Sequence, residues 1–173
     1  GMYGAFGLEP GTLQGKLLMN MDSEDFGELY VGCAGGMDAT IEWKYQGVAL
    51  PVGDIALKVN ITGLKGGHSG LEINLGRANA NKLLFRFLKE AVSQYEARLA
   101  KVEGGNMRNA IPREAYAIIT VPAEAREEIE KLVEEYRDLF NEEYKVTENT
   151  IVFTCEEVEA PEMLIPEEIQ DDL

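Results

Sequence analysis

The chain is short of histidine and cysteine, and this shortage argues against two kinds of hydrolytic site. Its 173 residues include one histidine and two cysteines. A zinc site usually combines several histidine, cysteine and carboxylate ligands, so a complete catalytic zinc site is hard to assemble from this chain alone. A Ser-His-Asp triad is also disfavoured, because His68 is the single available base and the sequence has no GxSxG motif.

Basic residues are also scarce, at 16 against 31 acidic ones, which gives a net charge of −15 at pH 7. Nucleic acids and anionic membrane surfaces attract basic patches, so neither is an expected partner. No apolar run approaches the roughly 20 residues of a membrane helix, and the N-terminus lacks the pattern of a signal peptide. Cys33 and Cys155 lie far apart in strand-like segments, and we expect free thiols in a reducing cytoplasm.

The composition that remains is that of a globular protein, with 45% hydrophobic and 27% charged residues. The length suits one domain, or one domain and part of another. Residues 1–50 have the pattern of strands and turns, with short apolar runs at 17–21 and 29–34 that resemble buried strands. If these runs belong to a larger sheet, we expect them to pair with each other, to pair with a second copy, or to be poorly ordered.

Three later segments have a strand pattern. Residues 55–62 alternate between apolar and polar side chains, as in a strand with one buried face. Residues 115–121 and 150–155 are short runs rich in β-branched and aromatic side chains.

Two segments have a helical pattern. The first begins near residue 75 or 77, carries an apolar stripe as far as Leu99, and ends at Gly104. The second follows Pro122 and has an apolar stripe over residues 125–140.

The order of these elements predicts an α+β fold, with two helices packed on one face of a mostly antiparallel sheet. We expect a further pair of strands within the loops. From Glu156 to Asp172 the sequence has eight acids and no base, so residues 162–173 are predicted to be a solvated acidic tail.

An acidic turn at residues 22–25 follows the first apolar run and includes Asp22. Carboxylates at the point where a strand leaves a sheet are well placed to bind metal or to act as a general base. Alternatively, the turn caps a neighbouring element.

The glycine-rich segment 63–70 contains His68. Its glycines allow positive φ and close backbone approach, so the loop can hold an imidazole out toward a ligand oxygen. The alternative is a tight connection with a capping or solvated histidine. A phosphate loop is less favoured, because the segment lacks the Gly-Lys-Ser/Thr ending.

A third polar segment, residues 104–113, joins the first predicted helix to a strand. Asn109 has an amide that can bind either backbone or a ligand. Arg108 or Arg113 can form a bidentate pair with a carboxylate.

Several separated motifs resemble the aminoacyl-histidine dipeptidases, also called Xaa-His or cytosol non-specific dipeptidases. Near the N-terminus they are GMYGAFGL at 1–8, LLMNMDSE at 17–24 and GELYVGCAGG at 27–36. Further along they are GLKGGHSG at 63–70, GRANA at 76–80 and RNAIPREA at 108–115. The resemblance extends in order to about residue 160.

This resemblance implies an internal fragment of a longer two-zinc enzyme. Residues 1–50 correspond to the end of the first half of its catalytic domain, and 51–161 to much of its lid or dimerisation domain. Members hydrolyse dipeptides with a metal-bound water and a carboxylate base. The resemblance makes Asp22 a terminal zinc ligand and His68 the lid histidine that stabilises the substrate carbonyl. Asn109, with Arg108, would bind substrate.

By this resemblance the parent is a cytoplasmic homodimer, and the isolated fragment is expected to be inactive and to bind no zinc. The competing interpretation is a free-standing α+β interaction or dimerisation module without catalysis. It is supported by the regular two-helix pattern and the incomplete active site.

Overall fold

The computed structural model describes residues 3–21, 25–32, 35 and 37–173, and it divides the chain into two compact units, Gly1–Glu42 and Trp43–Leu173. Within the described part of the first unit, the regular element is the short helix α1 (Tyr3–Phe6). No described helix is long and apolar enough to cross a membrane.

The described residues of the first unit do not form the strands predicted there. The described residues of the runs at 17–21 and 29–34 lie in irregular backbone, and Leu17 and Met19 are exposed. A strand is stable only where its backbone finds a partner, and these runs pair with no other described segment. Asp22 and Cys33 lie outside the described residues.

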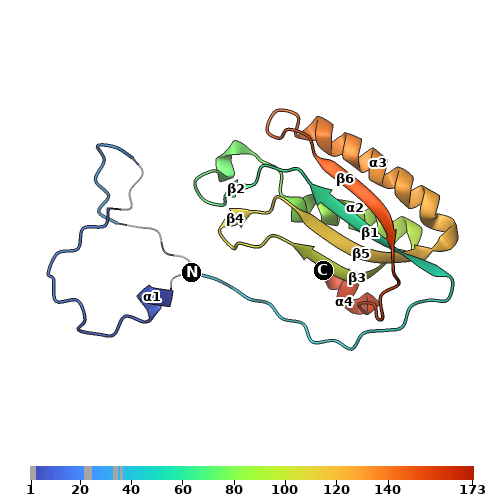
Figure 1. Ribbon diagram of the computed structural model, residues 1–173, viewed down its shortest axis with the longest axis horizontal. Helices are drawn as coiled ribbons and strands as arrows, with labels where there is room; N and C mark the ends of the chain where they lie inside the picture. The colour runs from blue at the N-terminus through green and yellow to red at the C-terminus, as the bar shows by residue number, and fades with distance from the viewer. Residues whose placement is uncertain (1–2, 22–24, 33–34, 36) are drawn as a thin grey trace. The chain divides into compact units, whose positions relative to one another are not determined.

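The second unit has the predicted α+β fold (Figure 1). Its four-stranded antiparallel sheet has the order β3-β5-β1-β6, and β2 and β4 form a separate pair. The strands are β1 (Asp54–Thr62), β2 (Gly67–His68), β3 (Arg98–Gly104), β4 (Ala110–Ile111), β5 (Ala115–Pro122) and β6 (Val152–Val158). The helices are α2 (Ala80–Tyr95), α3 (Arg126–Glu143) and α4 (Glu167–Asp172), with 3₁₀ turns η1 (Ile73–Leu75) and η2 (Ala123–Ala125).

Helices α2 and α3 lie side by side on one face of the sheet, as predicted (Figure 1). The alternation in β1 turns Leu57, Val59 and Ile61 toward them, and all three are fully buried. Aromatic side chains close the layer between helices and sheet. Phe87 of α2 packs edge-on against Phe153 of β6, with ring centroids 5.1 Å apart.

The first predicted helix is shorter than expected. It ends at Tyr95, Glu96 adopts a left-handed conformation (φ 55°), and the chain returns as β3. Leu99 fits the apolar stripe of a continued helix, but it also faces the core when β3 pairs with β5, opposite Ile119. Pairing with a strand more than ten residues away therefore overrides the local pattern. The short β2–β4 pair matches the expectation of further strands within the loops.

The C-terminal segment is not a solvated tail. Leu164 and Ile165 are buried, and Val48 and Leu164 form an isolated antiparallel bridge. The backbone N–H of Ile165 donates to the carbonyl of Leu99 at 2.7 Å, and the N–H of Leu99 donates to the buried side-chain oxygen of Gln170 at 2.7 Å. The segment covers the outer edge of β3 through the backbone of Ile165 and the side-chain amide of Gln170.

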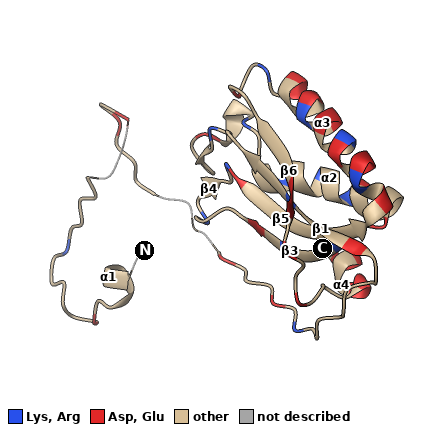
Figure 2. Ribbon diagram, turned by 45° about the vertical axis from the view of Figure 1, so that its right-hand side comes forward, with Lys and Arg blue, Asp and Glu red and all other residues tan. Residues whose placement is uncertain are grey.

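The outer surface of α3 carries many acidic and basic side chains along its length (Figure 2). Arg126 forms ion pairs with Glu130 on the next turn and with Glu157 of β6. Exposed pairs of this kind contribute little stability individually.

Candidate functional site

The candidate site is the loop between β1 and α2, which carries the single histidine. The chain leaves β1 through Gly63, where φ is +85° and an added Cβ would lie 2.5 Å from the carbonyl oxygen of Thr150. Glycine is required at this crossing because a side chain would clash with backbone. The loop then passes through β2 and η1 before α2 begins at Ala80.

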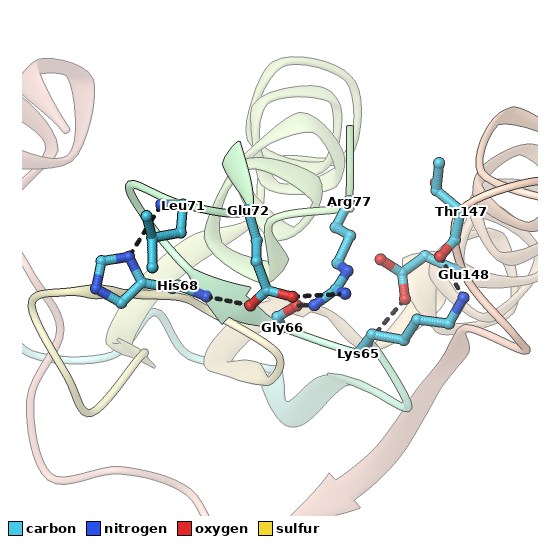
Figure 3. Close-up of polar contacts among 8 residues, drawn as sticks. All are labelled: Lys65, Gly66, His68, Leu71, Glu72, Arg77, Thr147 and Glu148. Carbon is cyan, nitrogen blue, oxygen red and sulfur yellow. Dashed lines mark hydrogen bonds and ion pairs between the residues drawn. The ribbon is translucent and has the colours of Figure 1, made fainter. Parts of the chain in front are cut away.

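His68 lies in β2 with its side chain exposed. Its Nδ1 atom accepts the backbone N–H groups of Gly70 at 3.0 Å and Leu71 at 3.1 Å. An imidazole nitrogen that accepts N–H groups carries no proton, so the neutral ring has its proton on Nε2. Figure 3 shows the ring turned so that Nδ1 faces the loop and Nε2 points away from it. The loop therefore presents Nε2–H as a hydrogen-bond donor.

An ion pair within the same loop holds the backbone of His68. Oε2 of Glu72 accepts the N–H of His68 at 2.8 Å, and Oε1 lies 2.8 Å from Nη2 of Arg77. Nη1 of Arg77 donates to the carbonyl of Gly66 at 2.5 Å (Figure 3). The hydrogen bond from the His68 N–H, followed by the charge of Arg77, lowers the pKa of the Glu72 carboxyl.

The brace formed by Glu72 and Arg77 passes close to Gly67. An added Cβ at Gly67 would lie 2.6 Å from Nη1 of Arg77 and 2.9 Å from Oε2 of Glu72, and φ there is +147°. Gly67, the third glycine of the motif, is thus explained chiefly by its positive φ, a conformation that strains any other residue.

The β2–β4 pair brings the third polar segment beside His68. His68 is opposite Ala110, and the N–H of Ser69 donates to the backbone carbonyl of Asn109 at 3.0 Å. Both Arg108 and Asn109 are exposed. The structure therefore places three of the four site residues expected from the sequence in one corner of the fold. Asp22, the fourth, lies outside the described residues.

Sequence reasoning missed a buried carboxylate behind this loop. Glu148 is 5% exposed, and its two oxygens accept the N–H of Lys65 at 2.8 Å and the N–H of Ala78 at 2.9 Å. Nζ of Lys65 donates to the carbonyl of Thr147 at 2.5 Å (Figure 3). No local signal marks Glu148, because its partners lie 83 and 70 residues away in the sequence.

The described residues do not form a metal centre. They contain no group of three or more histidine, cysteine, aspartate or glutamate side chains arranged to hold an ion. Zinc does not fit this described part of the chain. What the loop offers is a positioned N–H donor beside exposed amide and guanidinium groups.

The family model for the peptidase dimerisation domain matches residues 59–148. This range runs from β1 to the turn that carries Glu148, and so includes the whole His68 loop.

Two known proteins are similar over nearly the whole chain. The cytosol non-specific dipeptidase of Escherichia coli (strain K12) is 44% identical over 158 residues, which are 91% of this chain and 33% of that protein. The crystal structure of aminoacylhistidine dipeptidase from Vibrio alginolyticus matches with a TM-score of 0.77 and 42% identity, over 99% of this chain and 35% of that one. The chain thus spans about a third of the length of these relatives.

Proposed function

This chain belongs to the peptidase dimerisation domain family, and we propose from that premise that it supplies the lid and dimer-forming part of a dipeptidase. The names of both relatives support dipeptides, including aminoacyl-histidine dipeptides, as the substrate class. The name of the first also supports a cytoplasmic location. Residues 51–161 would be the lid, and residues 1–50 the end of a catalytic domain's first half.

In this proposal His68 donates a hydrogen bond from Nε2 to the scissile carbonyl of the substrate. The single observation that carries the assignment is the capture of Nδ1 by two backbone N–H groups, which leaves Nε2 as the donor. A fixed donor stabilises the negative charge that develops on a carbonyl oxygen when water attacks its carbon. Asn109 and Arg108, brought to the same corner by β4, would bind the polar ends of the dipeptide.

Zinc remains the proposed metal of the parent enzyme, and the proposal rests only on the resemblance of the sequence to the aminoacyl-histidine dipeptidases. Asp22 would be a terminal ligand of one of two zinc ions. Residues elsewhere in the parent enzyme would supply the other ligands and the carboxylate base. The isolated 173-residue chain is proposed to be inactive, because a lone carboxylate provides one of the roughly four ligands that zinc needs.

The proposed partner is a second copy of the chain, which would pair along β6. The C-terminal segment covers the outer edge of β3, whereas the outer edge of β6 has no strand partner among the described residues. An open edge is a template for strand pairing. Val152 of β6 is an exposed apolar side chain on this strand.

The experiment compares dipeptide hydrolysis by the protein encoded in the complete reading frame with hydrolysis by the 173-residue chain, each with zinc added. We expect turnover of Xaa-His dipeptides only by the former. His68→Ala should lower kcat by about 100- to 1000-fold with no change in bound zinc, whereas Gln94→Ala at an exposed position of α2 should change neither. Absence of dipeptide hydrolysis would contradict the proposal. Loss of zinc on His68→Ala would make His68 a ligand and not a donor.

The competing proposal is a free-standing interaction module. The open β6 edge favours it, because that edge allows pairing whether or not a catalytic domain is attached. A reading frame that starts at Met2 and stops after Leu173 would support the module, and one that continues on both sides with a histidine-containing metal motif upstream would support the dipeptidase.

A further inference from the structure

The buried carboxylate of Glu148 holds both ends of the loop that carries His68. Lys65 lies three residues before His68, and Ala78 lies two residues before the start of α2. Each donates its backbone N–H to a different oxygen of the same carboxylate, at 2.8 and 2.9 Å. The two ends of the loop are therefore held at a fixed separation by one side chain.

The hydrogen bond of Glu148 to Ala78 is buried, and the one to Lys65 is part-buried. Ala78 is fully buried and Glu148 is 5% exposed, so water does not replace a lost hydrogen bond easily. By contrast, the Glu72–Arg77 brace lies inside the loop and is partly exposed, with 36% and 22% of the side chains accessible. The Glu72–Arg77 brace sets the conformation of the loop around His68. Glu148 sets the position of the whole loop relative to the sheet and helices.

Glu148 belongs to the turn between α3 and β6, not to the loop that it holds. Its own N–H donates to the carbonyl of Tyr144 at 2.9 Å, and Thr147 accepts Nζ of Lys65 at 2.5 Å. The loop is thus tied at Lys65 by two contacts (Figure 3) and at Ala78 by one, all to the same turn.

We propose that Glu148 is a positioning residue for His68: its carboxylate clasps the backbone at Lys65 and Ala78 and so sets the place of the imidazole Nε2–H. The inference rests on the proposed role of His68 in dipeptide hydrolysis. In this role Glu148 acts only through the loop, because its carboxylate is taken up by the backbone N–H groups of Lys65 and Ala78.

The first test is a double-mutant cycle in the complete enzyme. Glutamine has one side-chain oxygen, so Glu148→Gln satisfies one backbone N–H and turns its own NH₂ toward the other, which frees one end of the loop. We expect kcat to fall about 10- to 100-fold with little change in KM, because a misplaced donor weakens transition-state stabilisation. In a His68→Ala background the same substitution should lower kcat by less than about twofold, since its effect runs through His68. Glu135→Gln, at an exposed position of α3, is the matched control and should be silent.

The second test does not depend on catalysis. The 173-residue chain has one histidine, so a tag-free sample gives one set of imidazole NMR signals. Glu148→Gln should shift and broaden these signals, together with the amide signals of Gly70 and Leu71, while the amides of α2 and β5 keep their positions. Glu135→Gln should leave all of them unchanged.

The two tests separate failure of this inference from failure of the proposed function. If the complete protein hydrolyses no dipeptide but the NMR signals move as expected, the function is wrong and the loop-positioning role stands. If the NMR signals of the loop do not move, or if the effects of Glu148→Gln and His68→Ala on kcat multiply, the inference is overturned. Glu148→Asp, which keeps the charge with a shorter reach, replaces Glu148→Gln if that variant does not fold. If neither folds, Glu148 has a global structural role and the proposal falls.

Discussion

The backbone N–H of His68 and the side chain of Glu72 are joined by a hydrogen bond of 2.8 Å, while the other oxygen of Glu72 pairs with Arg77. His68, whose imidazole is exposed, thus has its backbone anchored by the carboxylate of Glu72, four residues later in the sequence. The local conformation at His68 consequently depends on the ionisation of Glu72.

Acidification should release this anchor. The His68 N–H and Arg77 lower the pKa of Glu72 in the folded chain, so the native state favours the ionised carboxylate. Its stabilisation is present above the ordinary carboxyl pKa and is lost as pH falls through the lowered folded value. We expect the amide signal of His68, followed by NMR through an acid titration, to move as Glu72 becomes protonated.

Glu72→Gln should remove the part of that pH dependence that comes from the Glu72 carboxyl, whereas Glu124→Gln, at an exposed position of η2, should preserve it. An acid transition at the His68 amide that is unchanged in Glu72→Gln would show that another group controls it.

Gln170→Ala should destabilise the second unit. The substitution leaves the buried N–H of Leu99 without its acceptor, which costs about 1–3 kcal/mol in the free energy of unfolding. Urea denaturation followed by circular dichroism measures the change. Glu168→Ala, an exposed neighbour on α4, should stay within about 0.5 kcal/mol of the parent. Equal stability of the two variants would mean that the C-terminal segment does not secure the edge of β3.

Cys155 should react slowly with alkylating reagents. Burial raises the pKa of its thiol to about 11 from an ordinary value of 9.0, and the thiolate is the reactive species. At pH 8 we expect alkylation of the folded chain to be about 100-fold slower than in urea, as measured by mass spectrometry of the Cys155 peptide.

The raised pKa of Cys155 also makes the stability of the folded chain depend on pH. The native state favours the neutral thiol, so its contribution is kept below the ordinary thiol pKa and declines as pH rises toward 11. Alkylation at equal rates in folded and urea-unfolded chain would contradict the burial of Cys155.

Lysines on the open edge of β6 should weaken self-association. Val152 and Thr154 are both exposed on this strand, and edge lysines oppose strand pairing because they must be desolvated. If copies pair along β6, Val152→Lys with Thr154→Lys should raise the dimer dissociation constant at least tenfold in sedimentation velocity. Gln94→Lys, which also introduces a lysine but on α2, is the control. If the two lysine substitutions on β6 leave the dimer dissociation constant unchanged, the interface lies elsewhere.

The sequence predicted the parts of the fold that depend on local periodicity. The alternation at residues 55–62 predicted β1, and the apolar stripe at 125–140 predicted α3. The same reasoning extended α2 through Leu99, because Leu99 satisfies both a helical stripe and the inward face of β3. When an apolar residue fits both the helical period and the strand period, the sequence cannot decide between them unless the partner strand is known.

The candidate site divides in the same way. The glycine-rich segment and the resemblance singled out His68, Arg108 and Asn109 from the sequence, and the β2–β4 pair places them in one corner. Their roles in catalysis stay predictions. The tautomer of His68 and the contacts of Glu72 and Glu148 depend on backbone groups that the sequence does not locate.

The sequence by itself determined the α+β class, the acidic surface and the identity of the loop that carries the single imidazole. These follow from composition, hydrophobic period and glycine content, which are local properties of the chain. Only the tertiary structure decided that the acidic C-terminus covers β3 and that Glu148 clasps a loop 70 and 83 residues away. Such contacts are fixed by which buried N–H groups remain to be satisfied after the sheet and helices have packed.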